Sequence, residues 1–271
     1  MKKRLLLSSL LCLFLALPGC ASADPLRVDF YDVGKADAML ITTPGGQRIL
    51  IDAGTNKNGK ALAERFNQEG IDSIDLMIIT HYDKDHVGGA DKIIEGVGVG
   101  HVVMPIYDKE GKQYEQFAEA IAEYAVPTTQ LLTAKETTLT VDGVTLRISS
   151  AHKGSYGEDE ENDFSLCVRM NYGSTRFLFP GDAEAPRQRE LLQEGGLSCD
   201  VLKVPYHGRL VDASQDFLSA AAPKIAFIPD SADDPASPYI HAMLDALGTE
   251  THSAQQGDLT VFSDGERVWV E

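Results

Sequence analysis

Short apolar runs alternate with turn-forming residues along most of the chain. Three β-rich runs open the pattern, and glycine- or proline-containing turns separate them, "TPGGQ" being the clearest hairpin signal. A helical pattern in "KALAERFNQEG" ends at Gly70 and leads into an apolar run, "IDLMIIT", that is typical of a buried strand. Further helices are predicted over Val87–Glu95 and Glu110–Tyr124, with the strand "HVVMP" between them.

The second half of the chain repeats this order of strands followed by helices. Two hairpins turn at "VDG" and "NYGST", and a last hairpin, "DLTVFSDGERVWVE", closes the chain. Between them, strands "CDVLKVP" and "KIAFIP" alternate with helices at Glu184–Glu194, around Ser214–Ala221 and in "YIHAMLDALG". Sheets followed by helices, twice over, predict an α/β (α+β) fold in which two sheets pack face to face with helices on the outer faces.

The N-terminus has the features of an export signal. A basic start precedes an apolar run of 13 residues, Leu5–Leu17, which is too short to span a bilayer comfortably. "LPGC" resembles a lipoprotein cleavage box that would leave Cys20 lipid-bearing, whereas "ASA" resembles a site for release near residue 23. We favour the lipoprotein, because a cysteine directly after the run has little other reason to be there. Residues 1–20 are then the signal, and 24–271 are expected to form a single domain of an exported protein, anchored in the cell envelope or released as a periplasmic or secreted form.

The composition is strongly acidic. The formal net charge is −17, and removal of residues 1–20, which hold three basic residues and no acid, takes it to −20. Such a field repels polyanions, so it disfavours extended nucleic acid as a partner and leaves the lipid anchor as the only predicted contact with a membrane. Beyond the signal, Cys167 and Cys199 could form one disulfide or could simply be buried in apolar strands. The sequence gives no oligomeric state.

The stretch "THYDKDHVGGAD" carries the densest group of metal-compatible side chains. His81, Asp83, Asp85 and His86 follow directly after a buried strand. Residues two apart on an extended chain point to the same side, and a tight turn can then bring the next two side chains to the same point. Imidazole and carboxylate suit Zn²⁺, Mn²⁺ or Fe²⁺, and the lack of cysteine argues against a purely structural zinc site. The alternative is that the aspartates cap a helix while the histidines lie on the surface.

Two further candidates end distant strands. "RFLFPGD" ends with Asp182, and "VLKVPYHG" leads into His207. An acid or histidine beside glycine at the end of an apolar strand is placed at a sheet edge, where ligand sites commonly form. Either residue alone would be more typical of a turn, but with the first cluster they favour a site that holds two divalent ions.

Together these segments resemble the metallo-β-lactamase fold superfamily and, within it, the ComEC/Rec2-type hydrolases. The resemblance runs from Val28 to the C-terminus and rests on five segments in order: "FYDVGKADAMLI", "ILIDAG", "THYDKDHVGG", "NDFSLCVRMNYGSTRFLFPGDAE" and "LKVPYHG". The commonest metal motif of the superfamily is HxHxDH, whereas this chain has the HxDxDH variant of the ComEC-like branch. The resemblance implies a four-layer αββα sandwich.

The resemblance also implies roles for individual residues. His81 and Asp83 would serve one metal, Asp85 and His86 the other, Asp182 would bridge them, and His207 would complete the second site, with His152 as an uncertain third ligand of the first metal. Asp52 would orient a metal-bound histidine. Asp37 and His241 are placed near the site in support or substrate contact. The branch usually reads HHGS where this chain reads "YHGR", so the substrate contacts of Tyr206 and Arg209 depart from the pattern.

Two divalent ions about 3.5–4 Å apart, Zn²⁺ by preference and Mn²⁺ as the alternative, would activate a bridging water and clamp an ester or phosphate oxygen. No GxSxG nucleophile is present, so no side chain is expected to attack. Asp85 is the expected catalytic residue, because the resemblance implies that this metal ligand also orients the water. The carboxylate-rich motif favours a small phosphodiester or phosphate-ester substrate. A β-lactamase or lactonase, and a non-catalytic exported metal-binding protein, are the alternatives.

Overall fold

The computed structural model describes residues 24–157 and 161–271 of the chain. The predicted signal segment and its two cleavage options lie outside these residues. No helix within the described part is both long and apolar enough to cross a membrane.

The first sheet has eight strands in the order β15-β14-β1-β2-β3-β4-β5-β6. Strands β3 to β6 run parallel to one another, and the remaining neighbours pair antiparallel. The strands are β1 (Leu26–Phe30), β2 (Met39–Thr42), β3 (Arg48–Ile51), β4 (Leu76–Ile78), β5 (Val102–Pro105), β6 (Thr128–Leu131), β14 (Leu259–Ser263) and β15 (Val268–Val270).

The second sheet has seven strands in the order β13-β12-β11-β10-β9-β8-β7. Strands β10 to β13 are parallel, whereas β7 to β10 form antiparallel hairpins, as the turns at "VDG" and "NYGST" predict. The strands are β7 (Glu136–Val141), β8 (Val144–Ser149), β9 (Cys167–Tyr172), β10 (Thr175–Phe179), β11 (Val201–Lys203), β12 (Ile225–Ile228) and β13 (Glu250–Ser253).

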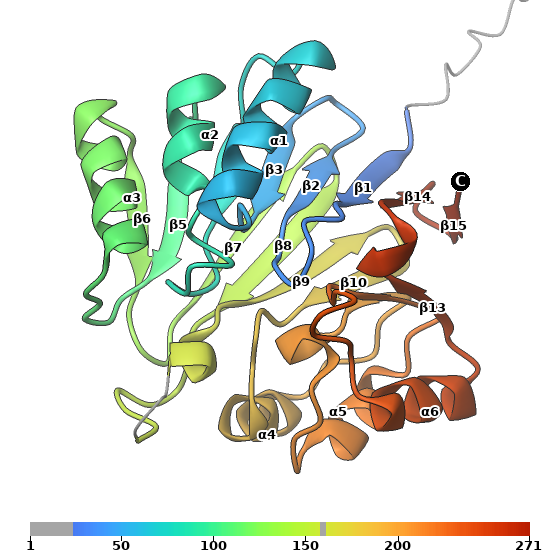
Figure 1. Ribbon diagram of the computed structural model, residues 1–271. Helices are drawn as coiled ribbons and strands as arrows, with labels where there is room; N and C mark the ends of the chain where they lie inside the picture. Colours follow the sequence, from blue (N-terminus) through green and yellow to red (C-terminus); the bar gives the residue numbers. More distant parts are fainter. Residues whose placement is uncertain (1–23, 158–160) are drawn as a thin grey trace, which may run out of the picture.

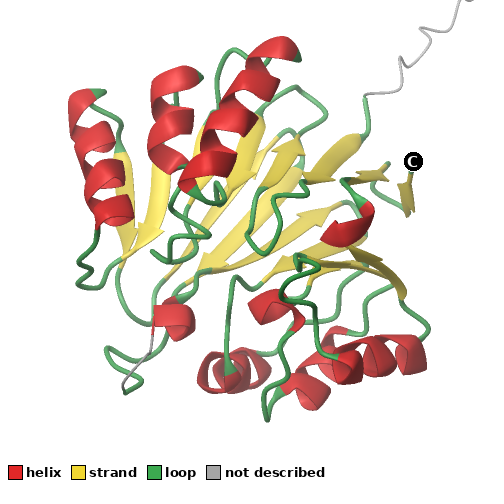
Figure 2. Ribbon diagram, in the orientation of Figure 1, coloured by secondary structure: helices red, strands yellow, loops and turns green. Residues whose placement is uncertain are grey.

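Three helices cover the outer face of each sheet, so that the molecule has four layers (Figures 1 and 2). Helices α1 (Asn56–Gln68), α2 (Ala90–Gly96) and α3 (Lys112–Glu123) lie on the first sheet, and α4 (Ala185–Glu194), α5 (Ser214–Ala221) and α6 (Pro238–Leu247) lie on the second. This arrangement confirms the predicted αββα sandwich.

The main core lies between the two sheets. Phe30 of β1 meets Phe179 of β10 and Phe227 of β12 across the interface, with ring centroids 6.0 and 5.0 Å apart. In the first sheet, alternate residues face away from this core. Leu40 of β2 and Leu50 of β3, for example, pack against the helices that cover the outer face. Both faces of the central strands are therefore buried, which explains why the sequence shows continuous apolar runs there rather than alternation.

Two strands have no apolar signal in the sequence. β6 reads "TTQL" and β13 reads "ETHS", and most of their side chains are partly or fully exposed because each is the outermost strand at one edge of its sheet. These two segments become strands because they pair with β5 and β12 through backbone hydrogen bonds, not because their side chains are buried. The helix predicted from Val87 begins at Ala90, after a turn that carries the metal-compatible residues.

Cys167 and Cys199 are free, and both are buried in the apolar layer between the second sheet and its helices. The structure thus has no disulfide between them, and the alternative of simple burial is correct.

The fold gathers the strand ends that carry the candidate residues. β3 and β4 are parallel neighbours in one sheet, and β10 and β11 are parallel neighbours in the other. The connections that follow these four strands hold Asp52, His81, Asp182 and His207. Since the carboxyl ends of parallel strands share one edge, residues separated by more than 100 positions meet there.

A close helix contact supports this edge. A Cβ at Gly59 in α1 would lie 2.3 Å from the Cα of Gly89, which is the residue before α2. We expect Gly59→Ala to destabilise the protein by about 1–3 kcal/mol in denaturant unfolding, because overpacking outweighs the better helix propensity of alanine. Gly154→Ala is the control, since its Cβ would meet no atom within 4 Å. A Gly59→Ala variant as stable as the parent would contradict the close contact.

Candidate metal centre

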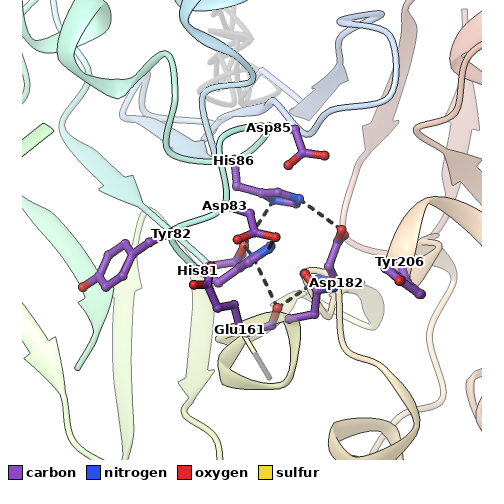
Figure 3. Close-up of polar contacts among 12 residues, drawn as sticks. His81, Tyr82, Asp83, Asp85, His86, Glu161, Asp182 and Tyr206 are labelled. Atoms are coloured by element: carbon purple, nitrogen blue, oxygen red, sulfur yellow. Dashed lines mark hydrogen bonds and ion pairs between the residues drawn. The ribbon is translucent and has the colours of Figure 1, made fainter. Parts of the chain in front are cut away.

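Three buried histidines each present an unpaired ring nitrogen to the same region. His81, His86 and His207 are at most 1 % exposed, and the Nε2 atom of each is buried without a hydrogen-bond partner. The rings of His81 and His86 lie 4.0 Å apart, and those of His86 and His207 lie 5.5 Å apart. Unpaired buried nitrogen is costly, so its threefold occurrence here indicates a site that a ligand completes. Figure 3 shows two of these histidines, His81 and His86, close to Asp83 and Asp182.

The opposite nitrogen of His86 and of His207 faces an acceptor. Nδ1 of His86 lies 2.8 Å from Asp52 Oδ2, and Nδ1 of His207 lies 2.8 Å from the carbonyl oxygen of Pro229. A carboxylate and a carbonyl only accept, so each Nδ1 donates its hydrogen and each Nε2 of the neutral ring keeps its lone pair. This is the tautomer that ligates metal through Nε2, and Asp52 has the orienting role that the sequence predicts for it.

His81 reaches the same tautomer through Thr80. The Thr80 hydroxyl donates to Asp52 Oδ2 over 2.7 Å, so it is free to accept from Nδ1 of His81 at 3.1 Å. Asp52 also accepts from the backbone N–H of Thr80 at 2.8 Å. One buried carboxylate therefore sets the orientation of two histidines.

Carboxylates lie close to the free nitrogens. Asp182 Oδ2 is 2.8 Å from His207 Nε2 and 3.2 Å from His86 Nε2, and Asp85 Oδ2 is 3.4 Å from His207 Nε2. Asp83 Oδ2 lies 3.8 Å from His81 Nε2. Two ligand atoms on one ion, each about 2.1 Å from it, are separated by roughly 3–3.5 Å, so these spacings fit shared coordination.

Asp37 joins this group more closely than a supporting role implies. One ligand atom from each of Asp37, His86, Asp182 and His207 lies within 4.8 Å of the others, and all four residues are buried. Oδ1 of Asp37 lacks a hydrogen-bond partner, and Oδ2 is ion-paired with a buried lysine described below. The residues present thus fit at least one divalent cation, with Asp83, Asp85 and His81 beside it.

Lys203 also belongs to the centre, although it is not among the site residues predicted from the sequence. Its side chain is fully buried, and Nζ lies 2.5 Å from Asp37 Oδ2, 2.9 Å from Asp182 Oδ1 and 2.9 Å from the carbonyl oxygen of Gly181. The sequence does contain a signal for it. Lys203 lies inside the apolar strand "VLKVP", and a buried lysine requires an acidic partner. Its ammonium offsets the charge of two carboxylates and fixes their positions.

Burial and neighbouring charges together shift the pKa values of the groups in the centre. Burial opposes protonation of His86, yet Asp182, Asp37 and Asp52 raise its pKa well above 6.5. Burial likewise opposes ionisation of Asp182, but His207, Lys203 and His86 hold its pKa well below the usual range. Burial lowers the pKa of His81 to about 3. A divalent cation would therefore compete with protons at His86 while finding His81 already neutral.

The structure does not bring His152 or His241 to the centre. Nε2 of His152 lies 2.9 Å from Glu194 Oε1, and its backbone N–H donates to Glu190, so the loop after β8 is held against α4 instead. Its side chain is 39 % exposed. His241 lies in the first turn of α6 in the outer helix layer, and its described contact is a backbone bond to Ser237.

Tyr206 and Arg209 lie on either side of His207 in the sequence. The loop that carries His207 is a short 3₁₀ segment, Pro205–Gly208, in which Tyr206 and His207 have left-handed backbone angles, with φ of 51° and 50°. Such angles cost about 1–3 kcal/mol for a residue with a side chain and are found preferentially at functional sites. Arg209 pairs with Asp234 over 2.6 Å and lies 5.4 Å from the Tyr206 ring centroid, which stiffens the loop from outside.

Comparison with known proteins agrees with this geometry. The family described as the metallo-beta-lactamase superfamily matches residues 31–229. Recombination protein 2 of Haemophilus influenzae is 29 % identical over 81 % of this chain and 26 % of its own, and ComE operon protein 3 of Bacillus subtilis is 25 % identical over 77 % and 29 %. The chain thus spans about a quarter of the length of these relatives. The metallo-beta-lactamase fold protein YhfI of Bacillus subtilis superposes with a TM-score of 0.57 at 14 % identity, over 92 % of this chain and all of that one.

We expect Asp52→Asn to weaken metal binding about 10–100-fold, because the amide can no longer accept in the same way from both His86 and Thr80. The measurement is competition for Zn²⁺ against a chromophoric chelator. Asp72→Asn, an exposed acid in the turn before β4, is the matched control. Equal Zn²⁺ affinity in Asp52→Asn and in the parent would contradict the orienting role of Asp52.

Proposed function

Since the chain belongs to the metallo-β-lactamase superfamily, we propose that it is a metal-dependent hydrolase that acts on small phosphodiesters or related phosphate esters. The observation that carries the proposal is the set of three imidazoles whose Nε2 atoms are buried, unpaired and fixed in the ligating tautomer beside Asp182. Divalent cations bound there would lower the pKa of a coordinated water and draw charge from a phosphoryl oxygen.

The residues of the chain divide the work of such a site. His81, His86 and His207 supply nitrogen ligands, and Asp182 supplies an oxygen within reach of two of them. Asp85 has its carboxylate 3.4 Å from His207 Nε2 and is 15 % exposed, so it can both ligate and hold a water on the solvent side. Burial raises the pKa of its carboxyl group, but the neighbouring imidazoles of His207 and His86 outweigh this effect and hold the pKa below the usual range.

Neither cysteine of the described residues is suited to act as the nucleophile in place of water. Both cysteines of the described chain are buried in the layer under α4 and α5, away from the metal centre, and burial raises the pKa of each thiol. A thiol that stays protonated and covered is a poor nucleophile. Water is therefore the proposed attacking group.

Two lysines favour an anionic ester over a β-lactam. Lys35 Nζ lies 3.3 Å from Asp85 Oδ2, and Lys109 Nζ lies 3.4 Å from Asp83 Oδ1, so each acid at the solvent side of the centre has an ammonium group beside it. Once those acids share their charge with a metal, the ammonium groups would be available to a phosphate oxygen. Together with Asp83 at the place of the commoner histidine, this arrangement supports the phosphate-ester assignment.

Recombination protein 2 and a further relative, competence protein ComA of Neisseria gonorrhoeae, have names that point to recombination and competence, but a formal charge of −17 supports a small substrate rather than extended nucleic acid. The metal is proposed to be Zn²⁺, with Mn²⁺ as the alternative. A β-lactamase or lactonase, and a non-catalytic metal-binding protein, are the competing functions.

The protein is also proposed to act outside the cytoplasm, as a lipoprotein anchored through Cys20. Expression of the full chain in a bacterium should place it in the membrane fraction, and Cys20→Ser should move it out of that fraction. Recovery of both forms as soluble periplasmic protein would instead support cleavage near residue 23.

The central test compares two chromogenic substrates on protein supplied with Mn²⁺ or Zn²⁺. We expect hydrolysis of bis-p-nitrophenyl phosphate that a chelator abolishes, and a fall in kcat/KM of about 100-fold or more in Asp85→Asn, because the water loses its orienting carboxylate. Asp72→Asn should behave as the parent. Activity on nitrocefin alone would overturn the phosphate-ester assignment, and fewer than one bound ion per chain without rescue by added metal would favour the non-catalytic alternative.

A further inference from the structure

A cavity of about 530 Å³ opens beside the metal centre. Asp83 lines it on one side, and Tyr206, the neighbour of His207, lines it on another. In the view of Figure 3, Glu161 and Tyr206 lie on either side of Asp182. A substrate whose reacting bond sits at the centre would extend into this space, so the chemistry of its walls bears on which substrates fit.

The walls are acidic. Four carboxylates from four separate segments line the cavity: Asp83 from the motif after β4, Asp108 from the connection after β5, Glu161 from the 3₁₀ segment Glu161–Phe164, and Glu184 before α4. No lysine, arginine or histidine among the described residues lines it. Lys109 contacts Asp83 and Glu161 from a neighbouring hollow and offsets only one of the four charges.

These four acids do not gather at one point. Within residues 24–157 and 161–271, a single group of side chains is close enough to hold a metal ion, and it is the one formed by Asp37, His86, Asp182 and His207. The cavity acids instead surround a space of about 530 Å³. Such an arrangement fits an extended organic cation rather than a bare metal ion.

Unpaired polar atoms lie in the wall of the cavity and at the metal centre beside it. Asn162 lines the cavity, and its Nδ2 donates to Glu184 over 2.7 Å, but its Oδ1 is buried without a hydrogen-bond partner. At the adjoining centre, Nε2 of His81 and of His207 are fully buried and equally unpaired. An amide oxygen can only accept, so Asn162 Oδ1 lacks an N–H or O–H donor in a wall of the cavity.

Apolar surface completes the walls. Tyr107 and Phe164 stack with their ring centroids 4.5 Å apart and both line the cavity. Their partners Tyr82 and Tyr156 hold the pair in place from behind. This surface suits the methylene groups that would connect an ammonium group to an ester.

We propose that the cavity binds an organic ammonium or guanidinium group, so that the preferred substrate is a phosphodiester carrying such a cation on a short alkyl arm. This inference rests on the proposed function for the reaction and adds the substrate class. The phosphate lies at the metal centre near Lys35, and the cation lies among Asp108, Glu161 and Glu184, so the substrate is zwitterionic.

The test compares 2-aminoethyl p-nitrophenyl phosphate with propyl p-nitrophenyl phosphate, which has the same shape without the charge. We expect a kcat/KM about tenfold or more higher for the aminoethyl ester at low salt, since several partly exposed carboxylates each add a modest attraction. The ratio should fall toward one in the double variant Asp108→Asn, Glu184→Gln. Asp212→Asn, an acid that is 92 % exposed, is the control and should keep the ratio.

A binding measurement separates this inference from the reaction itself. Calorimetric titration of the metal-supplied protein with 2-aminoethyl phosphate and with propyl phosphate should show tighter binding of the former, reduced in the double variant. Equal affinities, or equal kcat/KM values, overturn the cation assignment. Failure to hydrolyse either ester while the aminoethyl compound still binds preferentially would overturn the proposed reaction and leave the cation site standing.

Discussion

The candidate centre depends on one buried carboxylate. Asp52 follows β3 and accepts hydrogen bonds from the backbone and hydroxyl of Thr80 and from Nδ1 of His86. It therefore joins the ends of β3 and β4, and it orients His86 directly and His81 through Thr80. Its own backbone is left-handed, with φ of 57°, a cost that the surrounding bonds must offset. Without this acceptor the imidazoles would be free to rotate or to exchange tautomer, and the free nitrogens would no longer point to one place.

Charge balance is the second constraint, and the buried lysine supplies it. Asp37 and Asp182 would repel each other in a centre closed to water, but Lys203 lies between them within 3 Å of both. The ammonium comes from the last residue of β11, the strand next to β10, and His207 follows four residues later. One short stretch of chain therefore carries both a candidate ligand and the group that steadies two acids. Among residues 24–157 and 161–271, Lys109 is the cation that contacts the wall acids of the adjoining cavity, at Asp83 and Glu161. The cavity is therefore less fully compensated than the centre, and in our proposal this contrast separates the two parts of the substrate.

Much of the fold could be predicted from local patterns. Hairpins at "TPGGQ", "VDG" and "NYGST" carry their own turn chemistry, and the central strands are apolar on both faces, so pattern and structure agree there. The polar strands β6 and β13 could not be found this way, since neighbouring strands rather than burial define them. His152 shows a related limit. The family resemblance predicted it near the centre, but Glu194 and Glu190 on α4 bind its loop instead. These acids lie about 40 residues further along the chain, so no local pattern around His152 could have indicated the contacts.

The sequence by itself determined the type of chemistry, because a dense HxDxDH motif after a buried strand, an acid and a histidine at two other strand ends, and their order are all local or sequential features. Only the tertiary structure decided how that chemistry is set up. It made Asp37 a neighbour of His86 and His207, placed Lys203 between two acids, fixed the tautomers through Asp52 and Pro229, and enclosed an acidic cavity with side chains from four segments. The reason is physical: a hydrogen bond, an ion pair or a cavity wall depends on distances between atoms, and residues 37, 182 and 203 become close only when two sheets pack with their strand ends along one edge.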